Sequence, residues 1–407
     1  MVPRVALVGI GGYGETLLGI LKAAVAEGLC RLVAAVVRTP GKYPQSERVL
    51  GDLCARSYST IEELLSSEDR KLDLVVIAGG VSCHSEAAII FLNTGCHVLC
   101  EKPAAGSLAD ARKMQAAAAK AGRMLSIGYQ GMFSPAIERL KRLKVSGELG
   151  VLRSAKARIC VPRGARYYQR RDWGGQQKTG GVMVLDSPIQ NATAHHLQNM
   201  LYLAGEEVHK AANPITVTAE NYRAAREAWA DTQFIQVETA ENVRIAMLST
   251  HACLQPLSIR VEYKFDRAMV IGLAGRTMIE ARDRMPEEIT EPQDVASLPF
   301  RAVIKAIQTG DYPACSIDNA LQHTACIEGS FAAAPPKTVP AEHVILSAPS
   351  SSIPSNSSGP VTAIRGITEL IQKAYKIGTG YAGAGATWAV SPNRVLLRDD
   401  LTVVQDG

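Results

Sequence analysis

Near the start of the chain stands the run Val5-Ala6-Leu7-Val8-Gly9-Ile10-Gly11-Gly12-Tyr13-Gly14. Its first four residues form a short apolar run that predicts a buried strand, and apolar residues at helical spacing follow the last glycine. The glycines between them have the spacing G-x-G-x-x-G, which in this context is typical of a dinucleotide-binding turn. Gly9 permits the tight turn, Gly11 lets the backbone approach a pyrophosphate, and Gly14 lets helix and strand pack closely. The helix amino terminus, at Gly12 and Tyr13, offers N–H groups and a positive dipole to phosphates.

The same alternation of apolar runs and helical segments continues beyond this turn. Strands are expected over 5–8, 32–37, 72–78, 97–100 and 124–128, and helices over 15–27, 60–65, 84–93 and 107–121. Two of these helices open with capping boxes, Thr60-x-x-Glu63 and Ser107-x-x-Asp110. Strands separated by helices of this length imply right-handed crossovers and a parallel sheet covered on both faces. The pattern predicts an α/β fold with an N-terminal Rossmann domain over residues 1–126.

The texture of the sequence changes after about residue 127. Apolar and polar residues alternate in five segments, 154–161, 232–238, 243–249, 258–263 and 268–273, as in an antiparallel sheet with one buried face. Helices are expected among them over 134–143, 191–203, 317–331 and 364–375, and a Ser/Pro/Gly-rich loop over 347–359. A second α/β domain is therefore predicted over 127–407, with a mainly antiparallel open sheet and a C-terminal segment able to pack back between the domains.

Composition excludes several classes of function. The chain has 407 residues and a formal net charge of only +5, which argues against nucleic-acid binding. No apolar run reaches the ~18–20 residues of a membrane span, and the start of the chain lacks the pattern of a signal peptide. The nine cysteines include no Cys-x-x-Cys pair, so no metal site is expected and the thiols are expected to be reduced. These features predict a cytoplasmic location.

The end of the second predicted strand bears on the cofactor. NAD sites usually place an acidic residue there, where it binds the ribose 2′-hydroxyl. This strand ends instead at Arg38-Thr39, with no carboxylate at the tip. Because Arg38 can pair with a 2′-phosphate, NADP is favoured, with NAD as the alternative. Arg38 as a solvated loop cation stacking on the adenine remains the other interpretation.

The run Gly95-Cys96-His97-Val98-Leu99-Cys100-Glu101-Lys102-Pro103 resembles the Glu-Lys-Pro signature of the Gfo/Idh/MocA oxidoreductases. Further matches follow in order along most of the chain: Gly128-Tyr129-Gln130, Phe133-Ser134-Pro135, Gly147-Glu148-Leu149-Gly150, and Trp173 ahead of Gly180-Gly181. The resemblance implies a Rossmann domain followed by a domain whose open sheet faces the cofactor and often builds oligomers, here a homodimer or homotetramer. It implies hydride transfer between NAD(P) and a hydroxyl or carbonyl group of a sugar or polyol.

The same resemblance makes Lys102 a catalytic residue that contacts the reacting hydroxyl and the cofactor. Lys102 follows a predicted strand, at the edge of a parallel sheet where ligands bind. An ammonium there stabilises a developing oxyanion, and desolvation can lower its pKa for proton transfer. Glu101 is expected to orient or neutralise Lys102, and His84 to lie near the cofactor.

The second catalytic element departs from the family pattern, which has an Asp and then a His near the start of a helix. Counting forward from Gly180-Gly181, Asp186 takes the Asp position and Gln190 the His position. Counting backward from Leu203-Ala204-Gly205, His195 takes the His position and Asn191 the Asp position. We expect His195 to be the general acid or base, with Asn191 on the same helix face and Asp186 nearby. In the alternative interpretation, His195 and His196 are structural residues and Gln190 occupies the catalytic position.

Aromatic and cationic residues predict where a sugar would bind. Tyr129 and Gln130 end the last strand of the Rossmann sheet. Tyr168, Arg170 and Trp173 belong to a segment crowded with rings and cations, which suits a sugar or sugar phosphate and is equally found in solvated loops. With Asn191, these complete the expected substrate-binding residues.

Two rival functions remain open from the sequence. A tightly held NAD could oxidise a sugar transiently to drive glycosidic cleavage, with the hydride returning afterwards. A degenerate site could serve a non-catalytic regulator that senses dinucleotides, an interpretation motivated by the irregular segment from Asp186 to His195. The small-molecule substrate is expected to be a carbohydrate in either enzymatic case.

Overall fold

The computed structural model describes residues 2–67, 69, 71–169, 171–283, 285–348 and 358–405. The chain divides into two units, one formed by Met1–Phe133 with Gln293–Leu321 and the other by Ser134–Pro292 with Gln322–Gly407. The division differs from the predicted one, 1–126 and 127–407, because a segment from far along the chain returns to the first unit. The predicted fold class, a Rossmann domain followed by a domain with a mainly antiparallel sheet, is confirmed.

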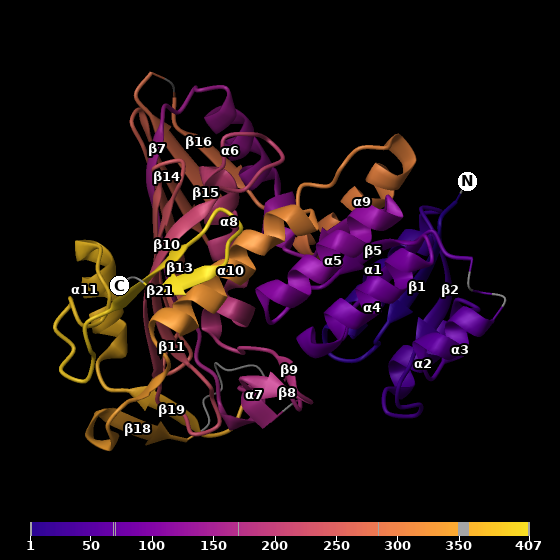
Figure 1. The fold of residues 1–407 in the computed structure, drawn as a ribbon, viewed down its shortest axis with the longest axis horizontal. Helices are drawn as coiled ribbons and strands as arrows, with labels where there is room; N and C mark the ends of the chain where they lie inside the picture. Colours follow the sequence, from indigo (N-terminus) through magenta and orange to yellow (C-terminus); the bar gives the residue numbers. More distant parts are fainter. Residues whose placement is uncertain are drawn as a thin grey trace. The chain divides into compact units, whose positions relative to one another are not determined.

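The first unit is built on a parallel sheet of six strands (Figure 1). The strands are β1 (Arg4–Val8), β2 (Arg31–Val36), β3 (Arg56–Tyr58), β4 (Leu74–Ile77), β5 (His97–Cys100) and β6 (Leu125–Ile127). Their order is β3-β2-β1-β4-β5-β6, so the direction in which strands are added reverses between β1 and β4. In an open parallel sheet this reversal marks the crevice where a dinucleotide binds, beyond the carboxyl ends of the strands.

Helices connect these strands, and all but α2 lie at predicted places. They are α1 (Tyr13–Ala26), α2 (Pro44–Asp52), α3 (Ile61–Ser66), α4 (Val81–Asn93) and α5 (Leu108–Ala121), followed by the short turn η2 (Gln130–Phe133). Both predicted caps are present, since the hydroxyl of Thr60 accepts the N–H of Glu63 at 3.2 Å and that of Ser107 accepts the N–H of Asp110 at 3.2 Å. Such caps stabilise a helix by ~1 kcal/mol each and fix where it begins.

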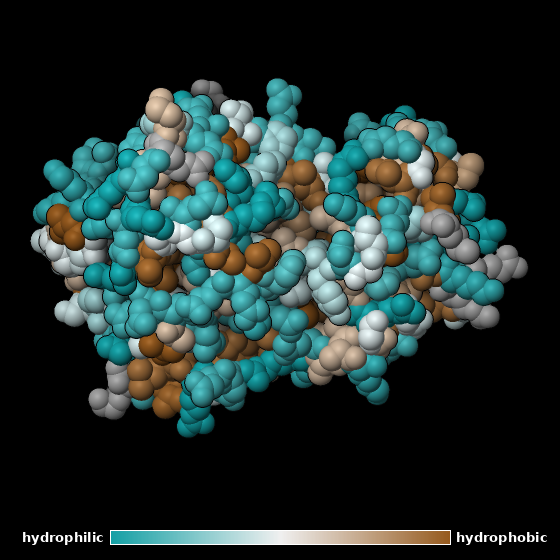
Figure 2. Space-filling model, turned by 90° about the horizontal axis from the view of Figure 1, so that it is seen from above, coloured by the Kyte–Doolittle hydropathy of each residue, from teal (hydrophilic) through white to brown (hydrophobic). Residues whose placement is uncertain are grey.

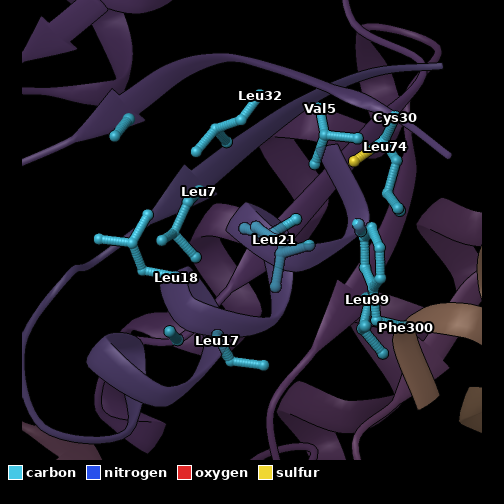
Figure 3. Close-up of a cluster of buried hydrophobic side chains, with 14 of the residues drawn as sticks. Val5, Leu7, Leu17, Leu18, Leu21, Cys30, Leu32, Leu74, Leu99 and Phe300 are labelled. Atoms are coloured by element: carbon cyan, nitrogen blue, oxygen red, sulfur yellow. The ribbon is translucent and has the colours of Figure 1, made fainter. Parts of the chain in front are cut away.

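The core of the first unit explains why the late segment returns to it. Leu17, Leu18 and Leu21 of α1 pack toward the strands, as Figure 3 shows for the cluster around Leu7 and Leu74. Phe300, on α9 (Leu298–Thr309), is 1% exposed in the same cluster, so burial of its ring fastens α9 to this unit. The segment before α9 carries the short turn η4 (Val295–Ser297), and α10 (Ile317–Ala333) leads into the second unit.

The second unit holds an eleven-stranded sheet that is antiparallel except where β12 pairs with β7 and β17 pairs with β10. Its strands are β7 (Leu152–Cys160), β10 (Pro214–Arg223), β11 (Thr232–Thr239), β12 (Arg244–Thr250), β13 (Leu257–Phe265), β14 (Ala268–Leu273), β15 (Arg276–Ala281), β16 (Glu287–Thr290), β17 (Lys337–Thr338), β20 (Asn393–Leu397) and β21 (Val403–Gln405). All five alternating segments of the sequence lie in strands of this sheet.

Helices and short strands complete the second unit. They are α6 (Pro135–Val145), α7 (Ala165–Gln169), β8 (Lys178–Thr179), β9 (Val182–Met183), η3 (Pro188–Ala192), α8 (Ala194–Ala204), η5 (Ala341–His343), β18 (Val344–Ser347), β19 (Val361–Ile364) and α11 (Ile367–Ile377). The predicted loop over 347–359 lies largely outside the described residues. The predicted helix over 364–375 begins later, because 361–364 form β19.

The predicted helix over 191–203 is wrong at its beginning. Residues Pro188–Ala192 form a π-helical turn, Thr193 leaves helical geometry with φ −118° and ψ 13°, and α8 starts only at Ala194. Asn191 and His195 therefore do not share one continuous helix, as the spacing of four had suggested. Single π turns are rare in proteins, and those that do occur often lie at functional sites.

Segments near the end of the chain pack on the large sheet. Ile371, Ala374 and Tyr375 of α11 join Phe234 of β11 and Leu248 of β12 in one buried cluster. The side chain of Lys156 on β7 lies over the ring of Tyr375, with 4.3 Å between Nζ and the ring centroid. On the face shown in Figure 2, hydrophobic residues form small patches among hydrophilic ones. Among the described residues, none of the helices combines the length and apolar character needed to cross a bilayer.

Candidate functional site

The glycine turn after β1 has the geometry of a phosphate cradle. Gly12 precedes α1 with φ 63°, and no side chain caps the helix amino terminus. A Cβ atom at Gly14 would collide with the carbonyl oxygen of Gly9, so only glycine allows the helix to approach the strand here. A helix amino terminus that lacks a side-chain cap suits an anion, and the turn therefore fits the pyrophosphate of a dinucleotide.

Tyr43 covers the middle of this turn, a contact that the sequence pattern did not reveal. A Cβ atom at Gly11 would overlap the tip of the Tyr43 ring, so the phenol lies directly against the Gly11 backbone. Tyr43 directly precedes α2 and is partly buried against the core of the first unit. Because the contact involves the far end of a flexible side chain, the ring can move aside where a ligand needs the space.

The loop after β2 presents cations and turns its carboxylate inward. Arg38, Thr39 and Lys42 are exposed. The carboxylate of Glu47 accepts the backbone N–H of Gly41 at 2.8 Å and that of Tyr43 at 3.3 Å. These contacts direct the negative charge of Glu47 into the loop backbone, which leaves Arg38 and Lys42 as the charged groups exposed on this loop.

Lys102 lies just beyond the carboxyl end of β5, as predicted, and the bond to Pro103 is cis. The neighbouring Glu101 carboxylate accepts the backbone N–H of Lys102 at 3.2 Å. Burial raises the pKa of Glu101 to about 7, against the opposing influence of the Lys102 charge and N–H. A Cβ atom at Gly128 would lie 2.7 Å from the Glu101 carboxylate, so the glycine after β6 makes room for it.

Two predicted residues from opposite ends of the first domain meet in the structure. The hydroxyl of Tyr13 donates to Oε1 of Gln130 at 3.1 Å, joining the glycine turn to the segment after β6. Burial, followed by the negative charge of Glu101, raises the pKa of Tyr13 well above its usual range, so this hydroxyl stays protonated. Tyr129 is fully buried within the first unit, whereas Gln130 is partly exposed.

His84 belongs to α4 and is 1% exposed. Its Nδ1 lies 2.8 Å from the carbonyl oxygen of Pro103, and its Nε2 lies 3.1 Å from that of Gly79. Burial lowers the pKa of the imidazole, and the nearby Lys102 charge acts in the same direction. Both ring nitrogens are thus engaged with the backbone beside the predicted catalytic lysine.

In the second unit the structure brings Asp186 and Asn191 together. One carboxylate oxygen of Asp186 accepts the Gly175 N–H at 2.6 Å, and the other accepts the Asn191 amide at 3.0 Å. The same Asn191 amide nitrogen lies 3.3 Å from the hydroxyl oxygen of Tyr167. Asp186 is 4% exposed and Asn191 is half-buried, so a charged acceptor sits behind a more accessible amide.

Buried polar side chains from distant strands and helices hold the π turn that carries Asn191. The Ile189 N–H donates to the side-chain oxygen of Gln233 at 3.0 Å, and the Ile189 carbonyl lies 3.2 Å from Nε2 of His323. The Thr193 hydroxyl donates to the Pro188 carbonyl at 2.8 Å and contacts the Ser249 hydroxyl at 3.2 Å. These contacts satisfy backbone groups that an interrupted helix leaves without their usual partners.

The two candidates for the catalytic position, His195 and Gln190, and the neighbouring His196 occupy different surroundings. Gln190 is 1% exposed, and its amide donates to the Val184 carbonyl at 3.3 Å. His195 and His196 lie in the first turn of α8 and are both partly exposed. Burial lowers the pKa of His196 to about 4, which keeps that ring neutral over the ordinary pH range. The choice between His195 and Gln190 stays a prediction.

The predicted sugar-binding segment forms an aromatic cluster. Tyr167 and Tyr168 are buried with edge-to-face rings whose centroids are 5.2 Å apart, and the Arg163 guanidinium lies 4.7 Å from the Tyr167 ring centroid. Trp173 is half-buried, with the Arg171 guanidinium 5.8 Å from its ring centroid. Arg170 lies outside the described residues.

Sequence reasoning missed several residues that shape these sites. Tyr43 directly precedes α2 and Glu47 lies in its first turn, and neither residue carries a motif of its own. Tyr167 precedes Tyr168 in the segment crowded with rings and cations but was not among the predicted residues, although its hydroxyl lies 3.3 Å from the Asn191 amide. Asp231 was not singled out, yet it is fully buried, accepts the Ala225 N–H at 2.6 Å, and has its pKa raised to about 6 by burial. None of these contacts follows from spacing, because each joins distant or irregular segments.

Comparison with known families matches residues 3–129 to the model of the oxidoreductase family with an NAD-binding Rossmann fold, Gfo/Idh/MocA. The chain is 33% identical to 1-carboxy-3-chloro-3,4-dihydroxycyclohexa-1,5-diene dehydrogenase of Comamonas testosteroni over 146 residues, only 36% of either protein. It is 26% identical to inositol 2-dehydrogenase 1 of Saccharopolyspora erythraea over 280 residues, which is 68% of this chain and 73% of that relative.

Most of the fold also has a counterpart among solved structures. A crystal structure described as a putative NADPH-dependent oxidoreductase from Desulfitobacterium hafniense superposes with a TM-score of 0.67 and 17% identity. The superposition covers 82% of this chain and 96% of the other. At that identity the likeness concerns the fold alone, and it extends the match well beyond the Rossmann domain.

Proposed function

We propose that this chain is an NAD(P)-dependent dehydrogenase or reductase acting on a sugar, a polyol or a related hydroxyl compound, because residues 3–129 match the model of the Gfo/Idh/MocA oxidoreductases. One observation carries the proposal: Lys102 follows β5 in the same parallel sheet whose β1–α1 turn forms the glycine cradle. The inositol dehydrogenase among its relatives supports a polyhydroxylated substrate.

The cofactor we propose is NADP. A nicotinamide supplies the hydride acceptor or donor when it is bound. The cofactor would be held by the turn Gly9–Gly14 at its pyrophosphate and by Arg38 and Thr39 at its adenosine ribose. Glu47 supports this choice, because its carboxylate is held by the loop backbone and does not extend toward the ribose as an NAD-type acidic residue would.

We assign each catalytic residue its role from its own surroundings. The Lys102 ammonium stabilises negative charge on the reacting oxygen, and Glu101 beside it keeps the local charge balanced when ionised. In the second unit, Asp186 orients the Asn191 amide for contact with a substrate oxygen. His195 is assigned the proton transfer, since an imidazole can give or take a proton near neutral pH. Gln130, Arg170 and Trp173 are assigned to contact with the sugar, whereas the buried Tyr129 and Tyr168 are assigned to the support of these segments.

A panel of sugars and inositols tests the proposal, with NADP and NAD each followed by nicotinamide absorbance. We expect turnover with at least one polyol and a loss of ~10²–10⁴-fold in kcat for Lys102→Met, with dinucleotide binding retained. Turnover that survives in Lys102→Met would contradict the assignment. Release of stoichiometric NAD on denaturation, with glycoside cleavage that needs no added cofactor, would instead identify the redox-cycling alternative. Dinucleotide binding without turnover of any compound would favour the regulator.

Arg38 tests the choice of NADP. Charge-assisted hydrogen bonds contribute ~1.5–3 kcal/mol, so Arg38→Ala is expected to weaken NADPH binding by at least about tenfold and to leave NADH binding nearly unchanged. Titration of the protein with each reduced nucleotide, followed by fluorescence, measures both constants. Equal losses for the two nucleotides would place Arg38 on the adenine and would remove the argument for NADP.

A homo-oligomer is also part of the proposal, and light scattering measures its size.

A further inference from the structure

His84 joins two segments that bear on the reacting edge of the first unit. It lies near the amino end of α4, with its ring between the carbonyl of Gly79, which follows β4, and the carbonyl of Pro103, which follows Lys102. The distances are 3.1 Å and 2.8 Å, and the residue is 1% exposed. A ring so enclosed has no surface left for a cofactor or a substrate.

The proton on the ring decides which carbonyl is bound more strongly. A neutral imidazole carries one N–H and donates to one carbonyl, while only an imidazolium donates to both. Burial and the Lys102 charge favour the neutral ring. The shorter contact favours the tautomer with the proton on Nδ1, and this tautomer donates to Pro103. The bond therefore fastens the backbone immediately after Lys102.

We propose that His84 is a positioning residue for Lys102, acting by anchoring the turn at Lys102–Pro103 to the amino end of α4. The inference rests on the proposed catalytic role of Lys102. A lysine stem has four rotatable carbons, so the direction of its ammonium depends on where the turn holds its Cα. Displacement of a catalytic group by about 1 Å can cost ~10²-fold in rate, which makes this anchor matter for turnover more than for binding.

Three variants test the proposal. His84→Leu removes the donor, and His84→Gln keeps an amide that can reach one carbonyl. His97→Leu is the matched control, because His97 also bonds the Rossmann backbone, accepting the Met124 N–H at 3.1 Å, but does so at the opposite end of β5. Each variant is compared for melting temperature, NADPH dissociation constant, and kcat and KM on the compound that the wild type turns over fastest.

We expect His84→Leu to lower kcat by ~10–100-fold while the NADPH dissociation constant stays within about twofold. His84→Gln should recover part of the loss, and His97→Leu should keep the wild-type kcat. An unchanged kcat in a folded His84→Leu protein overturns the proposal. A loss that appears equally in NADPH binding also overturns it, since it would make His84 a cofactor contact. If Lys102→Met itself retains turnover, the proposed function fails instead.

A second measurement needs no substrate and serves if His84→Leu folds poorly. Lysines are reductively methylated with ¹³C, and the Lys102 resonance is assigned by its absence in Lys102→Arg. We expect the Lys102 resonance to change its chemical shift in His84→Gln and to remain at the wild-type position in His97→Leu. Identical Lys102 resonances in wild type and His84→Gln would overturn the proposal.

Discussion

The glycine turn of the first unit and the irregular segment from Asp186 to His195 in the second are built on different principles. The turn is a local structure, made by the conformations of Gly9 and Gly12 and by the close approach of Gly14 to Gly9. The irregular segment is held from outside, by Gln233 and His323 on distant elements. A local structure leaves a readable motif, whereas a structure held by long-range contacts does not.

The comparison also separates two expected consequences of substitution. Changes within the glycine turn should act on dinucleotide binding, because the backbone there is the proposed phosphate cradle. Changes within the segment from Asp186 to His195 should leave dinucleotide binding intact and lower turnover, because this segment belongs to the other unit and carries the proposed proton-transfer groups.

The largest effect is expected at Gly14. Gly14→Ala places a Cβ atom against the backbone carbonyl of Gly9, which cannot move as a flexible side chain would. We expect loss of measurable NADPH binding, at least ~10²-fold, together with a lower melting temperature. Gly19→Ala is the control in the same helix: nothing lies within 4 Å of the added Cβ, and alanine favours a helix by up to ~1 kcal/mol. Retained NADPH affinity in Gly14→Ala would break the assignment of the turn.

Asp186 should give the next largest effect. Asp186→Asn keeps the shape of the side chain but loses the negative charge that accepts the Gly175 N–H and the Asn191 amide. We expect kcat to fall by ~10²-fold with the NADPH dissociation constant unchanged. Asp266→Asn is the control, since Asp266 pairs with Arg153 at an exposed site of the same unit and should retain the wild-type kcat. A parallel loss of NADPH affinity in Asp186→Asn would show that this segment acts on dinucleotide binding as well as on turnover.

His195 and Gln190 are decided by a matched set of variants. His195→Asn is expected to lower kcat by ~10–10²-fold and to flatten the dependence of kcat on pH near neutrality. His196→Asn should do neither, because its pKa of about 4 leaves nothing to titrate there. If Gln190→Leu alone lowers kcat, the forward count from Gly180-Gly181 identifies the catalytic place and His195 is structural.

The sequence predicts the local structures of this molecule and misses those that long-range contacts hold. All strands of the first unit except β3 were predicted from apolar runs, and both caps were predicted because Thr60 and Ser107 act on neighbouring residues. Lys102 was found by its motif and its place after a strand. The beginning of α8 was missed, since the π turn at Pro188–Ala192 depends on Gln233 and His323, which no local pattern connects to it. The return of 293–321 to the first unit was missed because it rests on burial of residues such as Phe300.

The smallest effect concerns the charge beside Lys102. The pKa of Glu101 is raised by burial from 4.5 to about 7, so the folded protein holds this proton at a pH where the unfolded chain has released it. The favourable contribution is complete below about pH 4.5 and is lost as the pH rises through 7. Relative to wild type, Glu101→Gln should therefore become more stable as the pH rises over this window, by at most about 3 kcal/mol in unfolding free energy. The gain is measured as a rise in its melting temperature relative to that of the wild type. Glu62→Gln, at an exposed position of α3, should show a constant difference. A pH-independent difference for Glu101→Gln would contradict the raised pKa of Glu101. It would mean that the positive charge of Lys102 fully offsets the cost of burying the ionised carboxylate.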